Sequence, residues 1–281
     1  MLSGHWQTCI ARVSRTAKAR PPGATRKVYP LKLDRAAFSA YDDIAGMYHG
    51  MWGDWYLPAA LPALEKLFFS KVGAGARVVD VCCGSGHVTQ ELVRRGYRVT
   101  GIDSSARLIA IAQRSLPGVD FRVQDVRELR VDGSFEAAIS TFDSLNHMMT
   151  VEDLRAVFKQ VHGALRPGGV FVFDMNLAEA YSADLRQWHV NIADGSVGLV
   201  RGTYDGDTKK AATELIWFVR DEGTECWRRQ QSVVEERCYA EGEILAAVYA
   251  AGFGKVEVVP AIAAGVDATL GFGRIFVTAY S

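Results

Sequence analysis

The chain has 281 residues, of which 49% are hydrophobic and 23% charged, and these proportions are typical of a globular protein rather than a disordered or fibrous one. Basic and acidic residues both number 32, so the net charge of +0 gives no general reason to expect nucleic acid as a partner. The charge is unevenly distributed, because residues 1–33 carry seven basic side chains and no acidic one. Residues 34–281 hold the remaining 25 basic side chains against 32 acidic ones, a net charge of −7.

The five cysteines show no C-x-x-C spacing, and Cys82 and Cys83 are adjacent, so we expect neither a disulfide framework nor a zinc site. No apolar stretch approaches the roughly 18 residues that span a bilayer. These features predict a cytoplasmic protein without a membrane partner. Residues 1–33 can be interpreted as a transit peptide or a nucleic-acid-binding arm, but we favour a disordered extension.

From residue 34 onward, helical and extended patterns alternate. The predicted order is helix 57–70, strand 77–81, helix 88–95, strand 97–102, helix 106–115, strands 120–123 and 136–141, helix 151–165 and strand 170–174. Such alternation is typical of βαβ units, which bury a parallel sheet between two helical layers. We therefore predict an α/β fold with a Rossmann-like, doubly wound, mostly parallel seven-stranded sheet.

Residues 185–239 break this alternation. Four strands joined by Asp-Gly, Gly-Asp and Glu-Gly turns are predicted at 188–192, 197–204, 211–220 and 226–239. The α/β pattern resumes with helix 241–251 and strands 255–259 and 274–280, and a tight loop before the last strand predicts a hairpin that adds one antiparallel strand. We interpret residues 34–281 as one domain with an antiparallel cap inserted at about 185–239, after the fifth strand.

The loop Cys82–Gly86 follows the first predicted strand, where an α/β fold binds its ligand, and its glycines 84 and 86 let backbone approach that ligand. A dinucleotide fingerprint requires a third glycine three residues after Gly86, but Thr89 stands there. A nicotinamide cofactor is therefore disfavoured. Asp80 would repel a pyrophosphate, whereas it suits a ligand that carries an ammonium or a sulfonium.

Two further acids stand at the ends of the next strands. Asp103 is placed to accept both hydroxyls of a ribose, and Asp125 to accept from an adenine amino group while Val126 packs on the ring. Either aspartate alone would also serve as an ordinary helix cap. Three acids at successive strand ends along one sheet edge favour a ligand site.

Five segments occur in the order and spacing of one family: Asp80–Gly86, Gly101–Ser105, Gln124–Val126, Phe142–His147 and Leu165–Gly169. Over about residues 38–175 the chain resembles class I S-adenosylmethionine-dependent methyltransferases. Tyr41–Ala45 followed by Tyr48, together with Phe173–Asn176, resembles the small-molecule branch that includes glycine and sugar-amine N-methyltransferases. The cysteine pair at 82 and 83 and the histidine at 87 depart from the family's usual residues.

The resemblance implies S-adenosyl-L-methionine as cofactor. It also implies that the two loop glycines line the methionine portion and that Thr141 and Phe142 lie beside the sulfonium, under a lid formed by Tyr41 and Tyr48. Residue pattern and resemblance together predict the following cofactor-binding residues: Tyr41, Tyr48, Asp80, Gly84, Gly86, Asp103, Ser104, Leu108, Asp125, Val126, Thr141 and Phe142.

Methyl transfer from a sulfonium has a neutral leaving group, so the protein chiefly aligns donor and acceptor and excludes water. His147, after the fourth strand, is our candidate catalytic base, and a loop histidine bound to backbone is the alternative. The candidate acceptor contacts are His49, Asp143, Trp188 and Arg201. No metal is expected, because the intervening Met175 breaks the adjacent Asp-Asn pair with which catechol-type methyltransferases hold magnesium.

We therefore predict methyl transfer to a small-molecule acceptor, at nitrogen first and oxygen next, with no nucleic acid as partner. A non-catalytic cofactor-binding protein is one alternative, and a nicotinamide-dependent oxidoreductase is a weaker one. The cap is predicted to form the acceptor wall. It would otherwise be a dimer interface, since exposed antiparallel strands readily pair, so the chain is expected to be a monomer or a homodimer.

Overall fold

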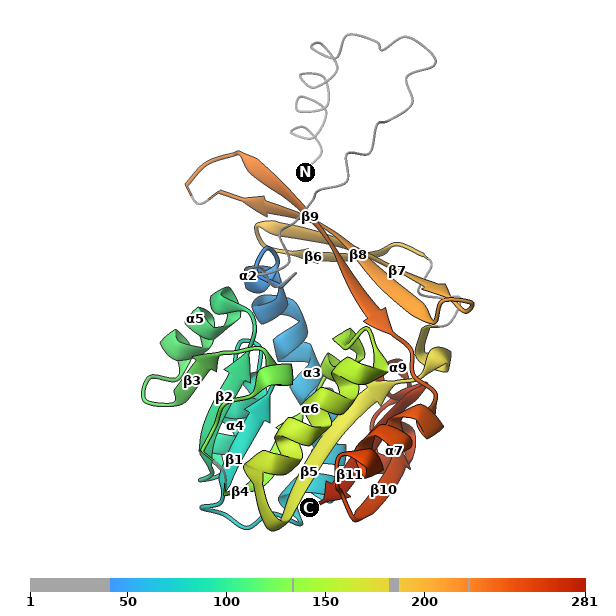
Figure 1. The fold of residues 1–281 in the computed structure, drawn as a ribbon. Coiled ribbons are helices and arrows are strands. Elements are labelled where there is room, and N and C mark those ends of the chain that lie inside the picture. The colour runs from blue at the N-terminus through green and yellow to red at the C-terminus, as the bar shows by residue number, and fades with distance from the viewer. Residues whose placement is uncertain (1–40, 133, 182–186, 222) are drawn as a thin grey trace. The chain divides into compact units, whose positions relative to one another are not determined.

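The computed structural model describes residues 41–132, 134–181, 187–221 and 223–281, and the prediction for residues 1–33 lies outside them. These described residues belong to one compact unit, Phe38–Ser281. They form a seven-stranded sheet flanked by helices and a separate four-stranded sheet (Figure 1).

The seven-stranded sheet has the order β10-β11-β5-β4-β1-β2-β3. Its strands are β1 Arg77–Val81, β2 Arg98–Asp103, β3 Asp120–Val123, β4 Phe135–Ser140, β5 Leu165–Asn176, β10 Lys255–Pro260 and β11 Arg274–Tyr280. Strand β11 runs antiparallel to both of its neighbours, and the pairings among β1 to β5 are parallel. The predicted mostly parallel, doubly wound sheet is therefore confirmed.

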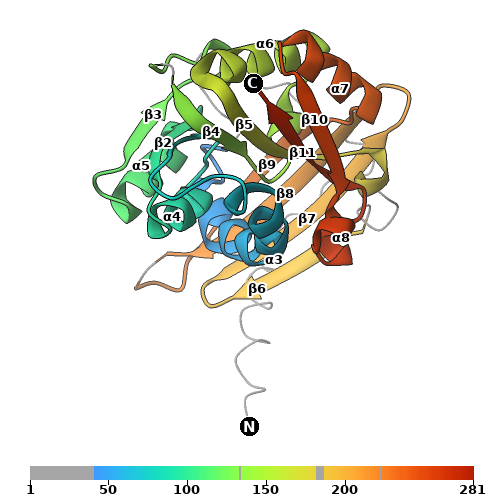
Figure 2. The ribbon, with the colours of Figure 1, turned by 90° about the horizontal axis from the view of Figure 1, so that it is seen from below.

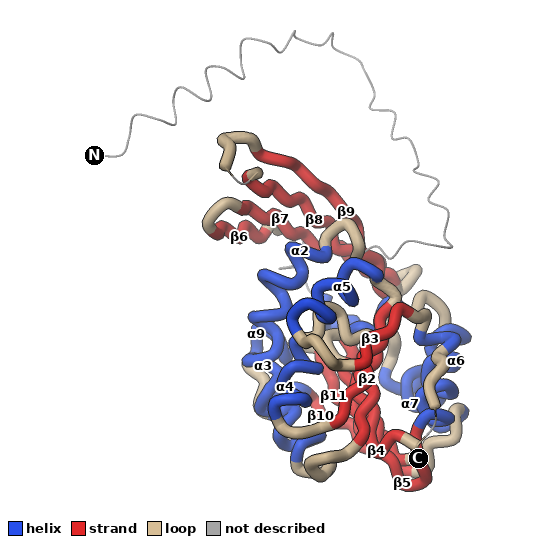
Figure 3. Tube along the Cα trace, turned by 90° about the vertical axis from the view of Figure 1, so that its left-hand side faces the viewer, coloured by secondary structure: helices blue, strands red, loops and turns tan. Residues whose placement is uncertain are grey.

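Helices cover both faces of this sheet, as the edge-on view in Figure 3 and the view from below in Figure 2 show. Apolar side chains of α3, η2 and α4 are buried in one hydrophobic cluster, and those of α6 and α7 in another. The bounds are α3 Asp54–Leu64, η2 Glu65–Phe69, α4 His87–Arg94, α5 Ala106–Ser115, α6 Val151–Ala164 and α7 Glu241–Ala250. Shorter helical segments are α2 Ala45–Met47, η1 Tyr48–Gly53, η3 Val126–Glu128, η4 Ser144–His147 and η5 Ala178–Tyr181.

The connection before the last strand differs from the predicted tight loop. Between β10 and β11 the chain forms two short helices, α8 Ala261–Ala264 and α9 Ala268–Gly271. The small side chains of Ala261 and Ala264 are buried against the cluster that contains α3, and Asp267 caps α9 by accepting from its first backbone N–H groups. The antiparallel direction of β11 was predicted correctly, whereas these helices were not.

The strand order reverses beside β1, which lies between β2 and β4. Because β1, β2 and β4 are parallel, their carboxyl ends meet at one edge of the sheet. This reversal is the position at which open α/β sheets bind ligands, in the crevice outside the strand ends. The fold thus places the Cys82–Gly86 loop at the expected binding edge.

The four-stranded sheet is an antiparallel meander of β6 His189–Ala193, β7 Ser196–Asp205, β8 Lys210–Arg220 and β9 Trp227–Arg237. It lies over the carboxyl edge of the larger sheet (Figures 1 and 3) and is called the cap below. Its buried Leu215, Trp217 and Val234 pack against Ile44 and Met47. The predicted antiparallel insertion after the fifth strand is confirmed.

Candidate active site

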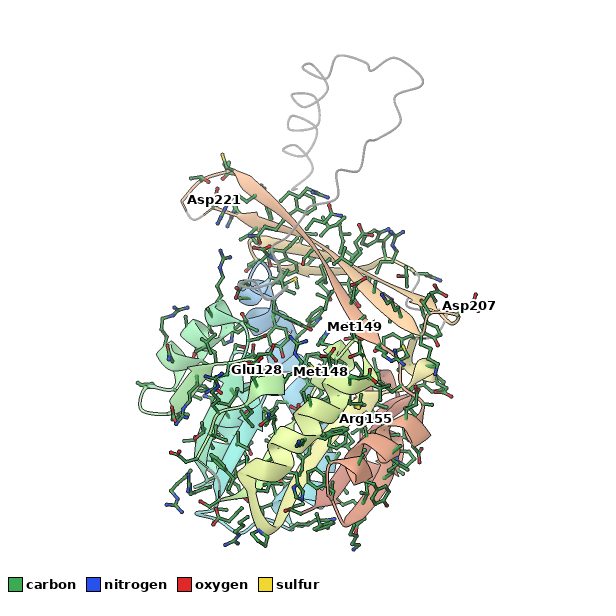
Figure 4. All side chains as sticks on the ribbon, in the orientation of Figure 1. Glu128, Met148, Met149, Arg155, Asp207 and Asp221 are labelled. Atoms are coloured by element: carbon green, nitrogen blue, oxygen red, sulfur yellow. The ribbon has the colours of Figure 1, made fainter. Side chains whose placement is uncertain are left out.

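A cavity of about 540 Å³ lies between the carboxyl edge of the large sheet and the cap. Figure 4 labels Met148 and Met149, which line this cavity beside the amino end of α6, and Asp207 and Asp221 at opposite ends of the cap. The wall combines strand ends, the four cap strands β6 to β9, and the aromatic segment before β1, which contributes Tyr41, Tyr48, Trp52 and Trp55. One space therefore reaches the predicted cofactor loop and the predicted acceptor wall.

Asp103 holds the backbone of the glycine loop at Gly84, and Asp103 and Gly84 both line the cavity. The Gly84 N–H donates to Asp103 Oδ2 at 2.9 Å, and the Ser105 N–H donates to Oδ1 at 2.8 Å. Burial raises the pKa of Asp103 above its ordinary value. Each carboxylate oxygen keeps a second lone pair, so this side chain can accept two hydroxyls, as a ribose would require.

Gly84 has a φ of +55°, and a Cβ at this position would lie 3.0 Å from the Tyr48 ring. Glycine therefore lets the Tyr48 ring pack closely against the loop. The paired acceptors of Asp103 and the adjoining aromatic rings suit a ligand that carries both a ribose and a sulfonium.

Two of the predicted cofactor-binding residues, Gly86 of the loop and Asp80 of β1, do not line the main cavity. At Gly86, with a φ of +88°, a Cβ would lie 3.2 Å from the Ala112 side chain, so this glycine faces α5. Asp80 is buried, accepts from Thr89 Oγ1 at 2.6 Å and lines a smaller neighbouring cavity together with Thr141. Burial raises the pKa of Asp80 to about 7.

The predicted adenine side is only partly at the cavity. Leu108 lines it, whereas Ser104 is exposed and Val126 is buried in the hydrophobic cluster. Asp125 is half-exposed and pairs with Arg127 at 2.5 Å, which lowers the pKa of this carboxyl. The cofactor roles of Ser104, Asp125 and Val126 remain predictions.

Aromatic side chains form the wall opposite the glycine loop. Tyr41, Tyr48, Trp52 and Phe142 all line the cavity. Tyr48 lies in η1, a π-helical turn, and its ring centre is 5.5 Å from that of Tyr41 and 6.1 Å from that of Phe142. Such ring faces attract a cation, so this wall suits a sulfonium.

A buried carboxylate, Asp42, anchors the start of the aromatic segment. Asp42 Oδ1 accepts from Ser105 Oγ at 2.6 Å and from the Arg107 backbone N–H at 3.1 Å. These bonds connect the segment before α2 to the amino end of α5, next to Asp103. Ser105, at the start of α5, therefore binds both Asp42, which is next to Tyr41, and the Asp103 carboxylate.

Phe142 and Asp143 follow β4 with φ values of 62° and 47°, a conformation that costs energy in residues other than glycine. A buried network holds them. Asp143 accepts from Arg274 Nη2 at 3.0 Å and from Asn176 Nδ2 at 2.8 Å, and its own backbone N–H donates to Asp174 Oδ1 at 3.1 Å. Arg274 also pairs with the carboxylate of Asp174. The charge of Arg274 is thus shared between two buried carboxylates.

His147 lies in the same cavity, with both ring nitrogens engaged. Nδ1 is 2.9 Å from the backbone carbonyl of Glu235, which can only accept, so Nδ1 carries the hydrogen. Nε2 then accepts from the Tyr41 hydroxyl at 2.8 Å. Burial lowers the pKa of His147, which favours the neutral ring.

Glu236, on cap strand β9, is a cavity residue that was not predicted from the sequence. Its carboxylate accepts from the Tyr181 hydroxyl, hydrogen bonds to Asp143, and lies 3.7 Å from His147 Nε2. Burial, with Asp143 as the next cause, raises the pKa of Glu236 to about 8. The sequence did hold a signal for Glu236. Side chains alternate between the two faces of a strand, so Glu236 shares a face of β9 with the apolar Val234.

The structure brings Asp143 into the cavity but not the other predicted acceptor contacts. Arg201 pairs with Glu214 at 2.6 Å and stacks on Trp188 at 4.6 Å, and neither Arg201 nor Trp188 lines the cavity. His49 packs beside His87, with ring centres 4.8 Å apart, and is also outside the lining. Their acceptor roles remain predictions.

Residues 78–169 match a family model described as a methyltransferase domain. A putative methyltransferase, YqeM of Bacillus subtilis (strain 168), is 34% identical over 144 residues, which cover 49% of this chain and 53% of the relative. The chain thus spans about half the length of this curated relative.

Solved structures extend the likeness in fold. A methyltransferase from Clostridium acetobutylicum ATCC 824 superposes with a TM-score of 0.71 at 21% identity, over 86% of this chain and 99% of that one. CalS10, an amino pentose methyltransferase from Micromonospora echinaspora, gives 0.66 at 25% identity, over 89% and 100%.

Residues 78–169 are therefore similar to a methyltransferase domain, and the chain has the class I S-adenosylmethionine-dependent methyltransferase fold. This confirms the resemblance and, with it, S-adenosyl-L-methionine as the cofactor of the class. Among the helices of the described residues, none combines the length and apolarity needed to cross a membrane.

Proposed function

We propose that this chain is an enzyme that transfers a methyl group from S-adenosylmethionine to a small-molecule acceptor, at nitrogen in preference to oxygen. The observation that carries the proposal is the one cavity shared by Gly84, Asp103 and the cap. A donor bound at the strand ends and an acceptor bound under the cap would meet inside it. The likeness to an amino pentose methyltransferase supports nitrogen as the accepting atom.

The residues divide into three roles. Gly84 and Asp103 would hold the methionine and ribose portions, and the aromatic wall around Tyr48 would face the sulfonium and exclude water. When bound, S-adenosylmethionine supplies a methyl group attached to a sulfonium sulfur, and on transfer the sulfur keeps the electron pair of the broken carbon–sulfur bond and leaves as a neutral thioether. An acceptor amine attacks with its lone pair, so it must first be free of its extra proton.

His147 is the proposed proton acceptor. Its Nδ1 hydrogen is fixed by the Glu235 carbonyl, which leaves the lone pair of the neutral ring on Nε2. That lone pair accepts from Tyr41 in this structure. Because the neutral ring has only one lone pair on Nε2, the acceptor nitrogen would have to replace the Tyr41 hydroxyl there, and its proton would then pass to Nε2 and leave the imidazole protonated.

Methyl-labelled S-adenosylmethionine incubated with the protein and a metabolite extract tests the proposal directly, with calorimetric titration of S-adenosylhomocysteine and NADH alongside. We expect S-adenosylhomocysteine to bind, NADH not to bind, and label to appear in a small molecule. Binding without label transfer would instead support a non-catalytic cofactor-binding protein. Preferential binding of NADH would contradict the donor assignment.

A further inference from the structure

We propose that Glu236 of the cap, with Asp143 beside it, binds the acceptor as a cation and so selects ammonium-bearing molecules over the corresponding alcohols. This inference rests on the proposed function, and it adds the recognition group and the charge of the acceptor. It starts from the charges around the cavity.

Asp143 and Glu236 line this end of the cavity as buried or nearly buried carboxylates, and the buried Asp174 lies behind Asp143. Among the described residues, Arg274 is the permanent cation here, and it pairs with Asp143 and Asp174. Within the same residues, Glu236 accepts from the Tyr181 hydroxyl and shares a hydrogen bond with Asp143, and Arg274 acts on it through its charge without forming an ion pair. A buried carboxylate without a cationic partner is costly, and either a proton or a bound cation removes that cost.

In the part of the chain that the structure describes, the other titratable groups that face Glu236 do not supply the missing charge. Tyr181 and Tyr41 are phenols whose pKa burial raises, so both stay neutral. Cys238, on the same chain segment, likewise stays a neutral thiol, because burial raises its pKa to about 12. His147 lies 3.7 Å away, but burial lowers its pKa. The bound acceptor is therefore the natural source of positive charge.

The geometry suits a nitrogen that carries several N–H groups. Glu236 Oε1 and His147 Nε2 are 3.7 Å apart, so one ammonium placed between them can donate to both once it replaces the Tyr41 hydroxyl at Nε2. Glu236 would hold the charge, and Nε2 would take the proton that must leave before attack. A hydroxyl acceptor has a single hydrogen to donate and no charge, so the buried negative charge of Glu236 would stay without a positive partner.

The test uses the full chain with S-adenosylhomocysteine bound and a panel of primary amines, each paired with its alcohol, from cyclohexylamine and cyclohexanol to glucosamine and glucose. Binding is measured by calorimetry for the wild type, Glu236→Gln and the control Glu225→Gln, whose side chain is exposed just before β9 and outside the cavity lining. We expect at least one amine to bind more tightly than its alcohol. That preference should fall about ten- to a hundredfold in Glu236→Gln, because a charge-assisted hydrogen bond is lost, and should persist in Glu225→Gln.

The outcomes separate the two proposals. If the wild type does not bind S-adenosylhomocysteine, the proposed function fails. If it does, and no amine binds more tightly than its alcohol, the ammonium site is overturned while the proposed function stands. An amine preference that survives in Glu236→Gln also overturns it. Unchanged S-adenosylhomocysteine affinity in Glu236→Gln is the expected sign that this variant keeps its fold.

Discussion

The Tyr41 hydroxyl donates to His147 Nε2 at 2.8 Å, although 106 residues separate the two side chains in the sequence. Tyr41 comes from the aromatic segment before β1, and His147 from the short helix after β4. The Glu235 carbonyl of the cap binds the other ring nitrogen of His147. One imidazole thus joins the three parts of the molecule that enclose the cavity.

The exchange His147→Gln tests the proposed proton acceptor. We expect kcat to fall about a hundredfold or more, because general base catalysis typically contributes at least that factor. Donor affinity, measured by calorimetry with S-adenosylhomocysteine, should stay unchanged. His162→Gln is the control, since that ring packs against Phe253 away from the cavity. Equal kcat values in the two variants would reduce His147 to a structural loop residue.

Replacing Asp103 by alanine should weaken donor binding about ten- to a hundredfold, because the hydrogen bonds from two ribose hydroxyls to a carboxylate are lost. Asp120→Ala is a suitable control, because this aspartate stands at the amino end of β3, opposite to the carboxyl edge where the cavity lies, and pairs with Arg122. Calorimetry with S-adenosylhomocysteine measures both. The same affinity in wild type and Asp103→Ala would remove Asp103 from the cofactor site.

The two loop glycines should respond differently to alanine. Both have positive φ, so each substitution costs roughly 1–2 kcal/mol of stability. Only Gly84→Ala puts a methyl group against Tyr48 at the cavity, so it should also weaken S-adenosylhomocysteine binding, whereas Gly86→Ala should not. Thermal unfolding and calorimetry separate the effects. If Gly86→Ala lost more affinity for S-adenosylhomocysteine than Gly84→Ala, the assignment of Gly84 to the ligand and of Gly86 to packing against α5 would be wrong.

Glu236 should make the ligand-free protein less stable as pH rises. Its pKa is raised from 4.5 to about 8 in the folded state, so between these values the folded chain holds a proton that the unfolded chain has released. The free energy of unfolding should therefore decrease from pH 4.5 to 8, and Glu236→Gln should make this decrease shallower. Asp80, whose pKa is raised to about 7, contributes with the same sign and should leave a residual slope. An unchanged slope in Glu236→Gln, measured by denaturant unfolding, would contradict the burial of this charge.

The sequence predicted the sheet and the insertion because each depends on local patterns, such as the short apolar strand around Val79 and the turns of the cap. The sequence also named Gly84, Asp103 and His147 as site residues, and all three line the cavity, since strand ends of a parallel sheet share one edge. Arg274 and Glu236 were missed because their importance comes from partners 55 or more residues away, for which a single sequence offers no pairing signal. Trp188 and Arg201 were chosen by residue type. Arg201 alternates along β7 with the lining residues Val200 and Gly202, so it belongs to the other face, where it stacks on Trp188.

The most direct test of the central claim is to identify the atom that receives the methyl group. The protein is incubated with S-adenosylmethionine carrying a ¹³C methyl group and a metabolite extract, and the products are observed by two-dimensional ¹H–¹³C NMR. We expect a new N-methyl resonance that requires the protein and is strongly reduced in His147→Gln. The account would be contradicted if no labelled product formed, or if the label appeared only in O-methyl or C-methyl groups.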